Sequence, residues 1–295
     1  MGGLGLLMRR RAIQAHPTAG SDYILSATKG DPEVFRILME KGVSSDGVGI
    51  TREDAARVTD IGTWFKGNTL IETFDEFKFF VGVTRLGRQE WASTNASFNG
   101  CSNLWLITLP PSLKQINYAV FNGCSNFEFV NLNEVDTIYH SAFIDCGKLN
   151  VEVIAPYLKG DLGAASFRKT AITRVLDLGE ITSISKGSGW SDGTFQGCPY
   201  LDVMIIPASV KSIGIMGLAA PNLKVCVMKS TTPPSIGQQI FSNLGTSKGF
   251  IYVPDEAVEA YKAATNWSSV ASYIKGVSLL PTDAPTIYEE ISNYL

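Results

Sequence analysis

A short motif that carries phenylalanine and cysteine recurs along the middle of the chain at a nearly fixed period. Phe121 follows Phe98 by 23 residues, and Phe143 follows Phe121 by 22. Phe167 divides the longer interval between Phe143 and Phe195. The copies read FNGCSNL at 98–104, FNGCSNF at 121–127, FIDCGKL at 143–149 and FQGCPYL at 195–201, with degenerate copies at 218–223 and 241–244. Self-similarity at this period is typical of a solenoid, in which each repeat packs against its neighbours because it cannot bury its own apolar face.

Each copy of the motif is followed by two short stretches with the apolar character of β-strands. In one repeat the first stretch is 104–109, which ends at a proline, and the second is 113–116. The first stretch fits the L-x-x-L-x-L spacing of a leucine-rich repeat. The sequence therefore predicts a mainly β solenoid over 98–254. We expect a leucine-rich-repeat stack with short strands on two sides and the motif phenylalanines buried in register.

The cysteines of the motif are interpreted as packing residues. Cys101, Cys124, Cys146 and Cys198 recur at one position of the repeat, and Cys226 lies in a predicted strand. An odd number of cysteines spread over a long chain does not indicate a disulfide framework. A small thiol at a fixed repeat position suits an internal ladder, whereas a metal or redox role is the alternative. We expect the first three to be reduced, buried and stacked, without a metal.

Residues 98–254 resemble the BspA-like bacterial leucine-rich repeats, whose unit reads approximately A-F-x-G-C-x-x-L-x-x-I-x-I-P-x-x-V-x-x-I. The segment 251–267 is similar to the closing segment of that family, a last strand followed by a capping helix. These repeats are found in surface and secreted proteins of gut and oral anaerobes. The resemblance implies adhesion or binding rather than one reaction, and it implies no particular ligand.

The segment 43–56 before the repeats resembles a degenerate calcium loop followed by a helix. A functional loop needs oxygen ligands at its first, third, fifth and twelfth positions and glycine at the sixth. Here the four ligand positions hold Val43, Ser45, Gly47 and Asp54, and valine replaces the glycine. Only two oxygen-bearing side chains remain, so we interpret this segment as a capping helix without a metal.

The chain divides into five predicted parts. They are an N-terminal arm at 1–25, a small helical N-terminal flank or cap at 26–90, the solenoid at 91–254, a C-terminal helical cap at 255–275 and a C-terminal tail at 276–295. Helices are expected mainly at 31–60 and 255–274.

Sequence motifs that carry catalysis are missing from the chain. It has no Gly-x-Ser-x-Gly elbow, no Gly-Lys-Ser phosphate loop and no paired-histidine zinc helix. The glycine-rich stretch 186–193 could bind phosphate, but it lies in a lengthened repeat, where inserted residues form a surface loop. His140 has no Cys or Ser partner placed by sequence, and His16 lies in the N-terminal arm. We predict no catalytic residue, no metal, no cofactor and no enzyme activity.

A net charge of −3 does not indicate a nucleic-acid partner, and no apolar run is long enough for a membrane span. Candidate binding residues therefore come from the solenoid, at the positions between the core residues of the first strand of each repeat. The residues in this row are Trp105, Leu106, Glu128, Phe129, Asp202 and Lys224. Trp190, in the glycine-rich loop, is a further candidate. Trp105 and Trp190 are the expected exposed anchors. As the alternative, Leu106 and Phe129 pack under a flanking segment.

The two ends are predicted to mediate assembly with a protein partner or with sibling subunits. Arg9, Arg10 and Arg11 follow an apolar stretch, the reverse of the order in a secretory signal peptide. A virion or cytoplasmic location is therefore expected, with the bacterial cell surface as the alternative. The apolar residues of the tail, which a lone monomer would leave partly wet, are Pro281, Pro285, Tyr288, Ile291 and Tyr294.

The predicted function is a structural or recognition protein that displays a repeat surface. We expect such a protein to be a virion component, associated with the tail or capsid of a bacteriophage. A bacterial surface or secreted adhesin that binds a host protein or glycan is the alternative.

Overall fold

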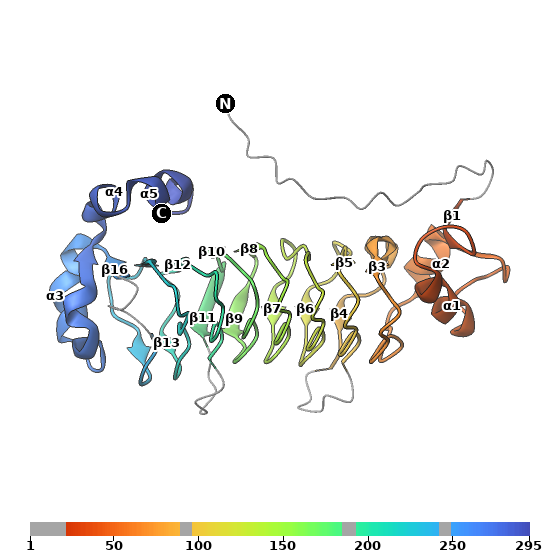
Figure 1. The fold of residues 1–295 in the computed structure, drawn as a ribbon, viewed down its shortest axis with the longest axis horizontal. Coiled ribbons are helices and arrows are strands. Elements are labelled where there is room, and N and C mark those ends of the chain that lie inside the picture. Colours follow the sequence, from red (N-terminus) through yellow and green to blue (C-terminus); the bar gives the residue numbers. More distant parts are fainter. Residues whose placement is uncertain (1–21, 89–95, 185–192, 242–248) are drawn as a thin grey trace.

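The structure is a computed structural model that describes residues 22–88, 96–184, 193–241 and 249–295. The chain forms an elongated β-solenoid with small helices at both ends (Figure 1). Short parallel strands lie along two sides of the solenoid, as predicted.

The first side of the solenoid carries the first strand of each repeat and, at its C-terminal end, a strand that follows the cap. They are β3 (Thr73–Phe74) paired with β5 (Leu106–Ile107), and a sheet of β8 (Glu152–Ile154), β10 (Arg174–Asp177), β12 (Val203–Ile206), β14 (Val225–Met228), β16 (Phe250–Val253) and β17 (Ile274–Gly276). Equivalent residues of successive repeats are paired, as Val203 is with Val225 and Met204 with Cys226. Because side chains alternate along a strand, Met204 faces the solenoid core and Val203 faces outward.

The second side carries shorter strands with a more polar outer surface. They are β4 (Arg85–Leu86), β6 (Gln115–Ile116) and β7 (Thr137–Ile138), and then β9 (Lys159–Leu162), β11 (Glu180–Ile184), β13 (Ser212–Ile213) and β15 (Ser235–Ile236). Ile116 pairs with Ile138 and both are buried, while the neighbouring Gln115 and Thr137 are half-buried. The alternation of polar and apolar residues therefore sets which side chains enter the core.

A column of stacked phenylalanine rings runs through the centre of the solenoid. Adjacent rings of Phe98, Phe121, Phe143, Phe167 and Phe195 are nearly parallel, with centroids 5.2 to 5.9 Å apart. All five side chains are fully buried, which confirms the predicted register. The column also includes Phe65, whose ring lies 5.2 Å from that of Phe98. The stack therefore extends into the range 26–90 that the sequence analysis assigned to a flank.

The glycine of the motif is explained by the backbone of the turn. Gly100 and Gly123 have φ values of +76° and +73°, a left-handed conformation that costs other residues about 1–2 kcal/mol. Asp145 and Lys169 occupy the same position in their repeats, also with positive φ. The amide of Gly100 donates to the carbonyl of Asn122 in the next repeat at 2.8 Å. The turn thus belongs to the ladder that joins the repeats.

The motif cysteines are buried and stacked, as predicted. The structure adds a polar role, because each thiol donates a hydrogen bond to the carbonyl of the column phenylalanine one repeat earlier. Cys124 Sγ lies 3.1 Å from the oxygen of Phe98, and Cys146 Sγ lies 3.0 Å from that of Phe121. The thiol is therefore a second donor to a carbonyl group that also accepts a backbone amide, as the carbonyl of Phe98 does from Cys101 at 3.1 Å.

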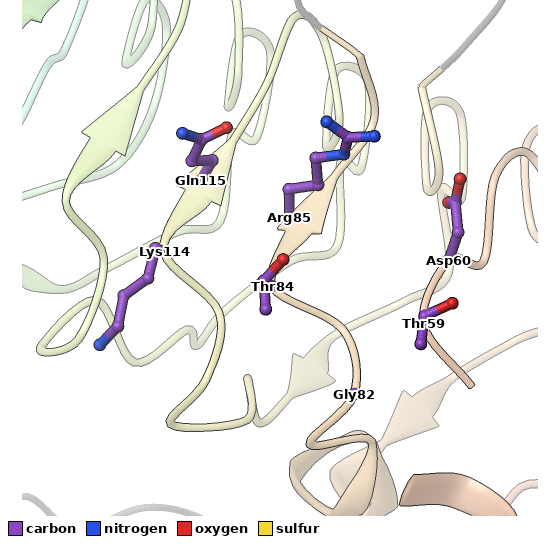
Figure 2. Close-up of a pocket in the computed structure, with 7 residues that line it drawn as sticks. All are labelled: Thr59, Asp60, Gly82, Thr84, Arg85, Lys114 and Gln115. Carbon is purple, nitrogen blue, oxygen red and sulfur yellow. The ribbon is translucent and has the colours of Figure 1, made fainter. Parts of the chain in front are cut away.

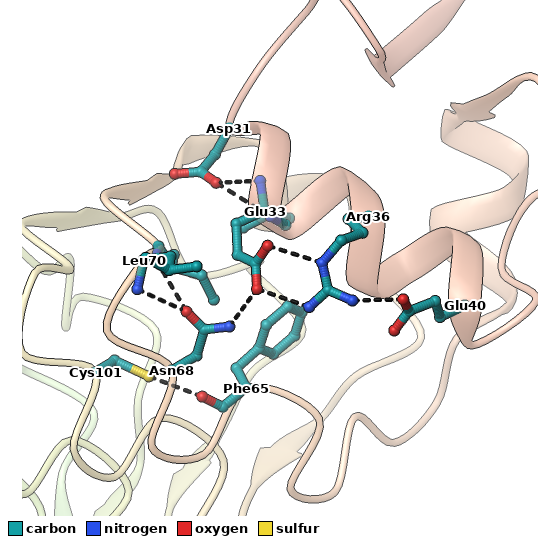
Figure 3. A network of polar contacts seen from close by, with 10 residues as sticks. Asp31, Glu33, Arg36, Glu40, Phe65, Asn68, Leu70 and Cys101 are labelled. Atoms are coloured by element: carbon teal, nitrogen blue, oxygen red, sulfur yellow. Dashed lines mark hydrogen bonds and ion pairs between the residues drawn. The ribbon is translucent and has the colours of Figure 1, made fainter.

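A helical flank covers the N-terminal end of the solenoid. Its elements are β1 (Tyr23–Ser26), α1 (Pro32–Glu40), β2 (Gly49–Thr51), α2 (Arg52–Arg57) and the 3₁₀ helix η1 (Asp75–Phe79). Asp31 Oδ1 caps α1 by accepting the amide of Glu33 at 2.9 Å, and its Oδ2 accepts the amide of Glu72 at 2.8 Å. Figure 3 shows a second link, in which Asn68 donates to Glu33 at 2.6 Å. These contacts join the flank to the first turn.

The loop that resembles a calcium site uses its carboxylates for local hydrogen bonds. Asp54 Oδ2 accepts the amide and hydroxyl of Thr51 at 2.9 and 2.8 Å, and Arg57 binds its other oxygen. Asp46 Oδ1 accepts the amide of Val48 at 2.8 Å. These carboxylates stabilise the start of α2 and the preceding turn.

The C-terminal cap closes the other end of the stack. It consists of the 3₁₀ helix η3 (Asp255–Ala257), α3 (Val258–Ala263) and the 3₁₀ helix η4 (Trp267–Tyr273). Trp267 Nε1 donates to the carbonyl of Pro234 at 2.8 Å, and the hydroxyl of Tyr261 donates to that of Ser230 at 2.9 Å. Both rings are fully buried. The cap therefore covers the apolar end of the solenoid and satisfies its last carbonyl groups.

The C-terminal tail packs on the chain's own first side. Of its apolar residues predicted to be partly exposed in a lone monomer, Ile291 is buried, Pro281, Tyr288 and Tyr294 are half-buried, and Pro285 is exposed. Its elements are η5 (Val277–Leu279), α4 (Leu280–Asp283), α5 (Pro285–Ile291) and η6 (Ser292–Tyr294), which also lie beyond the ranges where helices were predicted. Leu280 and Ile291 are fully buried in a second hydrophobic core that includes Val203 and Val225. The tail folds back (Figure 1) because the outward side chains of β12 and β14 are apolar.

Candidate binding surface

The outward surface of the first side falls into two parts, one covered by the tail and one left open by the described residues. The open part carries four of the residues predicted from sequence, Trp105, Leu106, Glu128 and Phe129. A fifth residue, Glu72, lies beside them. We call these five residues the Trp105 patch.

Backbone hydrogen bonds place the members of the Trp105 patch in successive repeats. The amide of Trp105 donates to the carbonyl of Glu72 at 2.9 Å, and that of Glu128 donates to the carbonyl of Trp105 at 3.0 Å. Leu106 and Phe129 form a parallel bridge beside this line. Adjacent strands lie about 4.8 Å apart, so the patch spans about 10 Å. A tryptophan thus lies between two glutamates, next to two further apolar side chains.

The Trp105 patch is only partly shielded from solvent. Glu72 and Glu128 are exposed, whereas Trp105, Leu106 and Phe129 are half-buried. Within the described ranges, neither glutamate forms an ion pair. The three apolar side chains belong to neither of the two hydrophobic cores of those ranges. The described structure therefore presents apolar side chains between two carboxylates, and neither carboxylate pairs with a cationic side chain of the described residues.

Asp202 and Lys224, the other two predicted residues on this face, lie apart from the Trp105 patch and bind each other. Lys224 Nζ lies 3.3 Å from Asp202 Oδ2, and Arg174 Nε lies 3.8 Å from Asp202 Oδ1. Arg174 also pairs with Glu152 at 3.4 Å and with Glu290 of the tail. Their charges are thus compensated within the chain, at the border of the tail.

Four predicted site residues, Trp190 and the arginines Arg9, Arg10 and Arg11, lie outside the described residues. Sequence reasoning missed Glu72, although a signal for it was present. Glu72 follows Phe65 by seven residues, as Trp105 follows Phe98. Extending the repeat back to Phe65 would have placed Glu72 in line with Trp105.

A shallow polar pocket lies on the second side, beside the flank (Figure 2). Its volume is about 490 Å³, and its lining residues are Thr59, Asp60, Gly82, Thr84, Arg85, Lys114 and Gln115. Lys114 Nζ lies 3.1 Å from Glu134 Oε2, and Asp60 Oδ1 accepts the amide of Gly62 at 2.7 Å. Among the described residues, no hydrogen bond joins a threonine hydroxyl of this lining to Asp60.

His140, for which the sequence placed no Cys or Ser partner, contacts the side chain of its neighbour Ser141. Their Nδ1 and Oγ atoms lie 2.6 Å apart, and Ser141 is buried. In the described part of the chain, no group of three His, Cys, Asp or Glu side chains could hold a metal ion. No helix in that part has the length and apolar character needed to cross a membrane.

The cysteines have the ionisation properties of core residues. Burial raises the pKa of Cys101 and Cys226 to about 12 and that of Cys198 to about 11. Burial also raises the pKa of Cys124 and Cys146. These thiols are neutral at physiological pH, whereas nucleophilic and metal-binding cysteines are thiolates. Their arrangement is therefore that of a structural ladder.

The free energy of unfolding is expected to fall as the pH rises above about 9. A thiol ionises near pH 8.5 in the unfolded chain, but its folded pKa is higher, so the stabilisation is complete below the unfolded pKa and is lost as the pH rises toward the folded one. Each buried thiol should cost about 1.4 kcal/mol per pH unit in this window. The variant Cys226→Ala should lack one such contribution when urea unfolding is measured at pH 9 and 10. Equal pH slopes for variant and parent would contradict this prediction.

Comparison with known proteins adds a family and a solved structure. Residues 94–188 and 190–259 match a family model described as BspA type leucine rich repeat region, in six copies. A leucine-rich repeat protein from Bacteroides ovatus shares 15% sequence identity over 66% of this chain and 84% of that chain, with a TM-score of 0.15. A search of the curated proteins found no match.

Proposed function

The chain belongs to the BspA-type leucine-rich repeat family, and from that premise we propose that it is a non-catalytic recognition protein whose partner binds the Trp105 patch. Leucine-rich repeats generally mediate protein binding, and the family is generally non-catalytic. A rigid stack of strands suits this role, because it presents side chains in fixed positions without an ordering cost on binding.

The composition and position of the Trp105 patch support this proposal. Tryptophan is enriched among the residues that dominate binding energy at protein interfaces. Trp105 is half-buried and lies outside both cores, with Leu106 and Phe129 beside it. Glu72 and Glu128 flank it, so a partner segment that combines basic and apolar side chains would match both the charge and the apolar area. We therefore propose a protein partner of this kind and treat a glycan as the alternative.

Two biological settings suit a displayed recognition surface. The chain serves as a virion component, associated with the tail or capsid of a bacteriophage, or as a bacterial surface or secreted adhesin. Residues 276–295 pack on the chain's own first side, so we do not propose them as the segment that attaches the chain to an assembly. Capsid or tail genes beside the coding sequence would support the first setting, whereas genes for cell-surface export would support the second.

Binding of the purified chain to peptide and glycan arrays tests the proposed function. We expect binding to peptides in which Arg or Lys adjoins apolar residues. The variant Trp105→Ala should weaken that binding by about 30-fold, because truncating a dominant interface residue costs about 2 kcal/mol or more. Tyr200→Ala is the matched control, since Tyr200 is also an exposed aromatic residue, at 63% exposure, but lies outside the patch.

Two results would overturn the proposal. Unchanged peptide binding by the double variant Trp105→Ala/Phe129→Ala would show that the partner binds elsewhere. Binding confined to the glycan array would replace the protein partner by a carbohydrate.

A further inference from the structure

The side chains of the Trp105 patch define the chemistry that an occupant would need. Glu72 and Glu128 offer two carboxylates that lack a cation among the described residues. Arginine suits this position, because its guanidinium group binds a carboxylate with two hydrogen bonds and also stacks on the face of tryptophan. Leu106 and Phe129 add a requirement for apolar side chains close to the arginines.

Asp31, which lies near the described start of the chain, contacts a member of this patch. Asp31 Oδ2 accepts the amide of Glu72 at 2.8 Å, and Trp105 lies one strand further along the first side. Asp31 follows Tyr23 by eight residues, so these two residues are at most about 28 Å apart. Tyr23 follows Arg11 by twelve residues, which can span about 40 Å. The segment before Tyr23 is therefore long enough to bring Arg11 to the patch of its own molecule.

Residues 6–11 have the composition that the patch requires. They read Leu-Leu-Met-Arg-Arg-Arg, with three apolar residues directly followed by three arginines. The arginines match the two glutamates in charge, and the apolar residues match Leu106 and Phe129. The opposite end of the chain provides a precedent on the same face, since Leu280 and Ile291 cover the outward residues of β12 and β14.

We propose that residues 6–11 bind the Trp105 patch of the same molecule and compete with the external partner. The inference rests on the proposed function, because it names an internal ligand of the same surface. The arginines pair with Glu72 and Glu128, one guanidinium group stacks on Trp105, and the apolar residues cover Leu106 and Phe129. An external partner must displace this segment before it binds, which lowers its apparent affinity by the fraction of open molecules.

Photo-crosslinking in the full-length chain tests this contact directly. Benzoylphenylalanine introduced in place of Leu7 should crosslink to residues 101–130, as identified by mass spectrometry. The same group in place of Leu279, which is 48% exposed on the tail, should not crosslink to residues 101–130. A mixture of isotopically heavy and light chains should yield crosslinks within one label only. Heavy-to-light crosslinks would overturn the proposal, because the occupant would then be a second copy.

Charge reversal tests whether ion pairing carries the contact. The double variant Glu72→Lys/Glu128→Lys should lower the crosslink yield by about tenfold, because the lost ion pairs weaken the internal contact by about tenfold in its equilibrium constant. Adding Arg9→Glu, Arg10→Glu and Arg11→Glu to that variant should restore the yield. Glu180→Lys is the matched control, because Glu180 is exposed on the second side. An undiminished yield in the double variant, or no restoration, would overturn the proposal.

The peptide array separates a failure of this inference from a failure of the proposed function. The triple variant Arg9→Glu/Arg10→Glu/Arg11→Glu should bind external peptides about tenfold more tightly than the parent, because its internal competitor is lost. Crosslinks at the patch without any peptide binding would reject the function and retain the internal contact. Peptide binding at Trp105 without the crosslinks would retain the function and reject the internal contact.

Discussion

Replacing Phe121 by alanine is expected to lower the free energy of unfolding by about 3–5 kcal/mol, the usual cost of emptying a buried phenylalanine site. The ring of Phe121 is fully buried, and its centroid lies 5.5 Å from that of Phe98, 4.9 Å from Phe127 and 5.3 Å from Phe143. Neighbouring repeats hold these rings in position through their backbone ladders, so the cavity cannot close by collapse. Urea unfolding followed by circular dichroism measures the loss.

Tyr157→Ala provides the control for the phenylalanine column. Tyr157 is an aromatic residue of the same solenoid but is 61% exposed, so its replacement should change the free energy of unfolding by less than about 0.5 kcal/mol. A cost below 1 kcal/mol for Phe121→Ala would show that the column does not stabilise the stack.

Replacing Leu280 and Ile291 by aspartate is expected to release the C-terminal tail from the first side. Both side chains are fully buried in the second core. Their replacement removes apolar contacts worth about 2–5 kcal/mol each, and an unpaired charge cannot be buried in their place. Amide hydrogen exchange in residues 277–295 should therefore accelerate by at least about 100-fold. The outward residues of β12 and β14 should become accessible to a hydrophobic dye.

Leu279→Asp is the matched control for the tail. Leu279 precedes Leu280 in the chain but is 48% exposed, so the same substitution there should leave the exchange rates unchanged. Slow exchange in the double variant would mean that polar contacts hold the tail, such as the hydrogen bond of 3.1 Å from the Tyr252 hydroxyl to Asp283.

The interpretations of the cysteines and of the calcium-like loop show which properties of a residue can be predicted from sequence. The recurrence of cysteine beside phenylalanine was sufficient to predict a buried ladder, because only a stack places equivalent residues next to each other. It did not reveal that Cys124 donates to the carbonyl of Phe98, since the two residues are 26 positions apart. Similarly, the loss of calcium ligands in 43–56 predicted a capping helix without a metal, but the reciprocal hydrogen bonds of Asp54 and Thr51 at the start of α2 depend on local geometry.

The sequence by itself determined the repeat architecture of this protein. Period, strand alternation and the glycine at a left-handed turn position are local properties, and a stack copies each of them from one repeat to the next. The phenylalanine column followed from the period alone. Only the start of the stack at Phe65 was obscured, because the first repeat keeps the phenylalanine and glycine of the motif but has asparagine in place of cysteine.

The tertiary structure alone decided which part of the first side is open. Leu106 and Val203 occupy equivalent outward positions and are both apolar, so a repeat pattern cannot distinguish them. Val203 is covered because Leu280 and Ile291, some 80 residues further along, fold back onto β12, whereas Leu106 is half-buried and belongs to neither hydrophobic core of the described ranges. Glu72 and Glu128 likewise became neighbours of Trp105 only through the ladder between repeats. The binding surface is thus set by long-range packing of the chain ends, which the periodicity of the repeats does not encode.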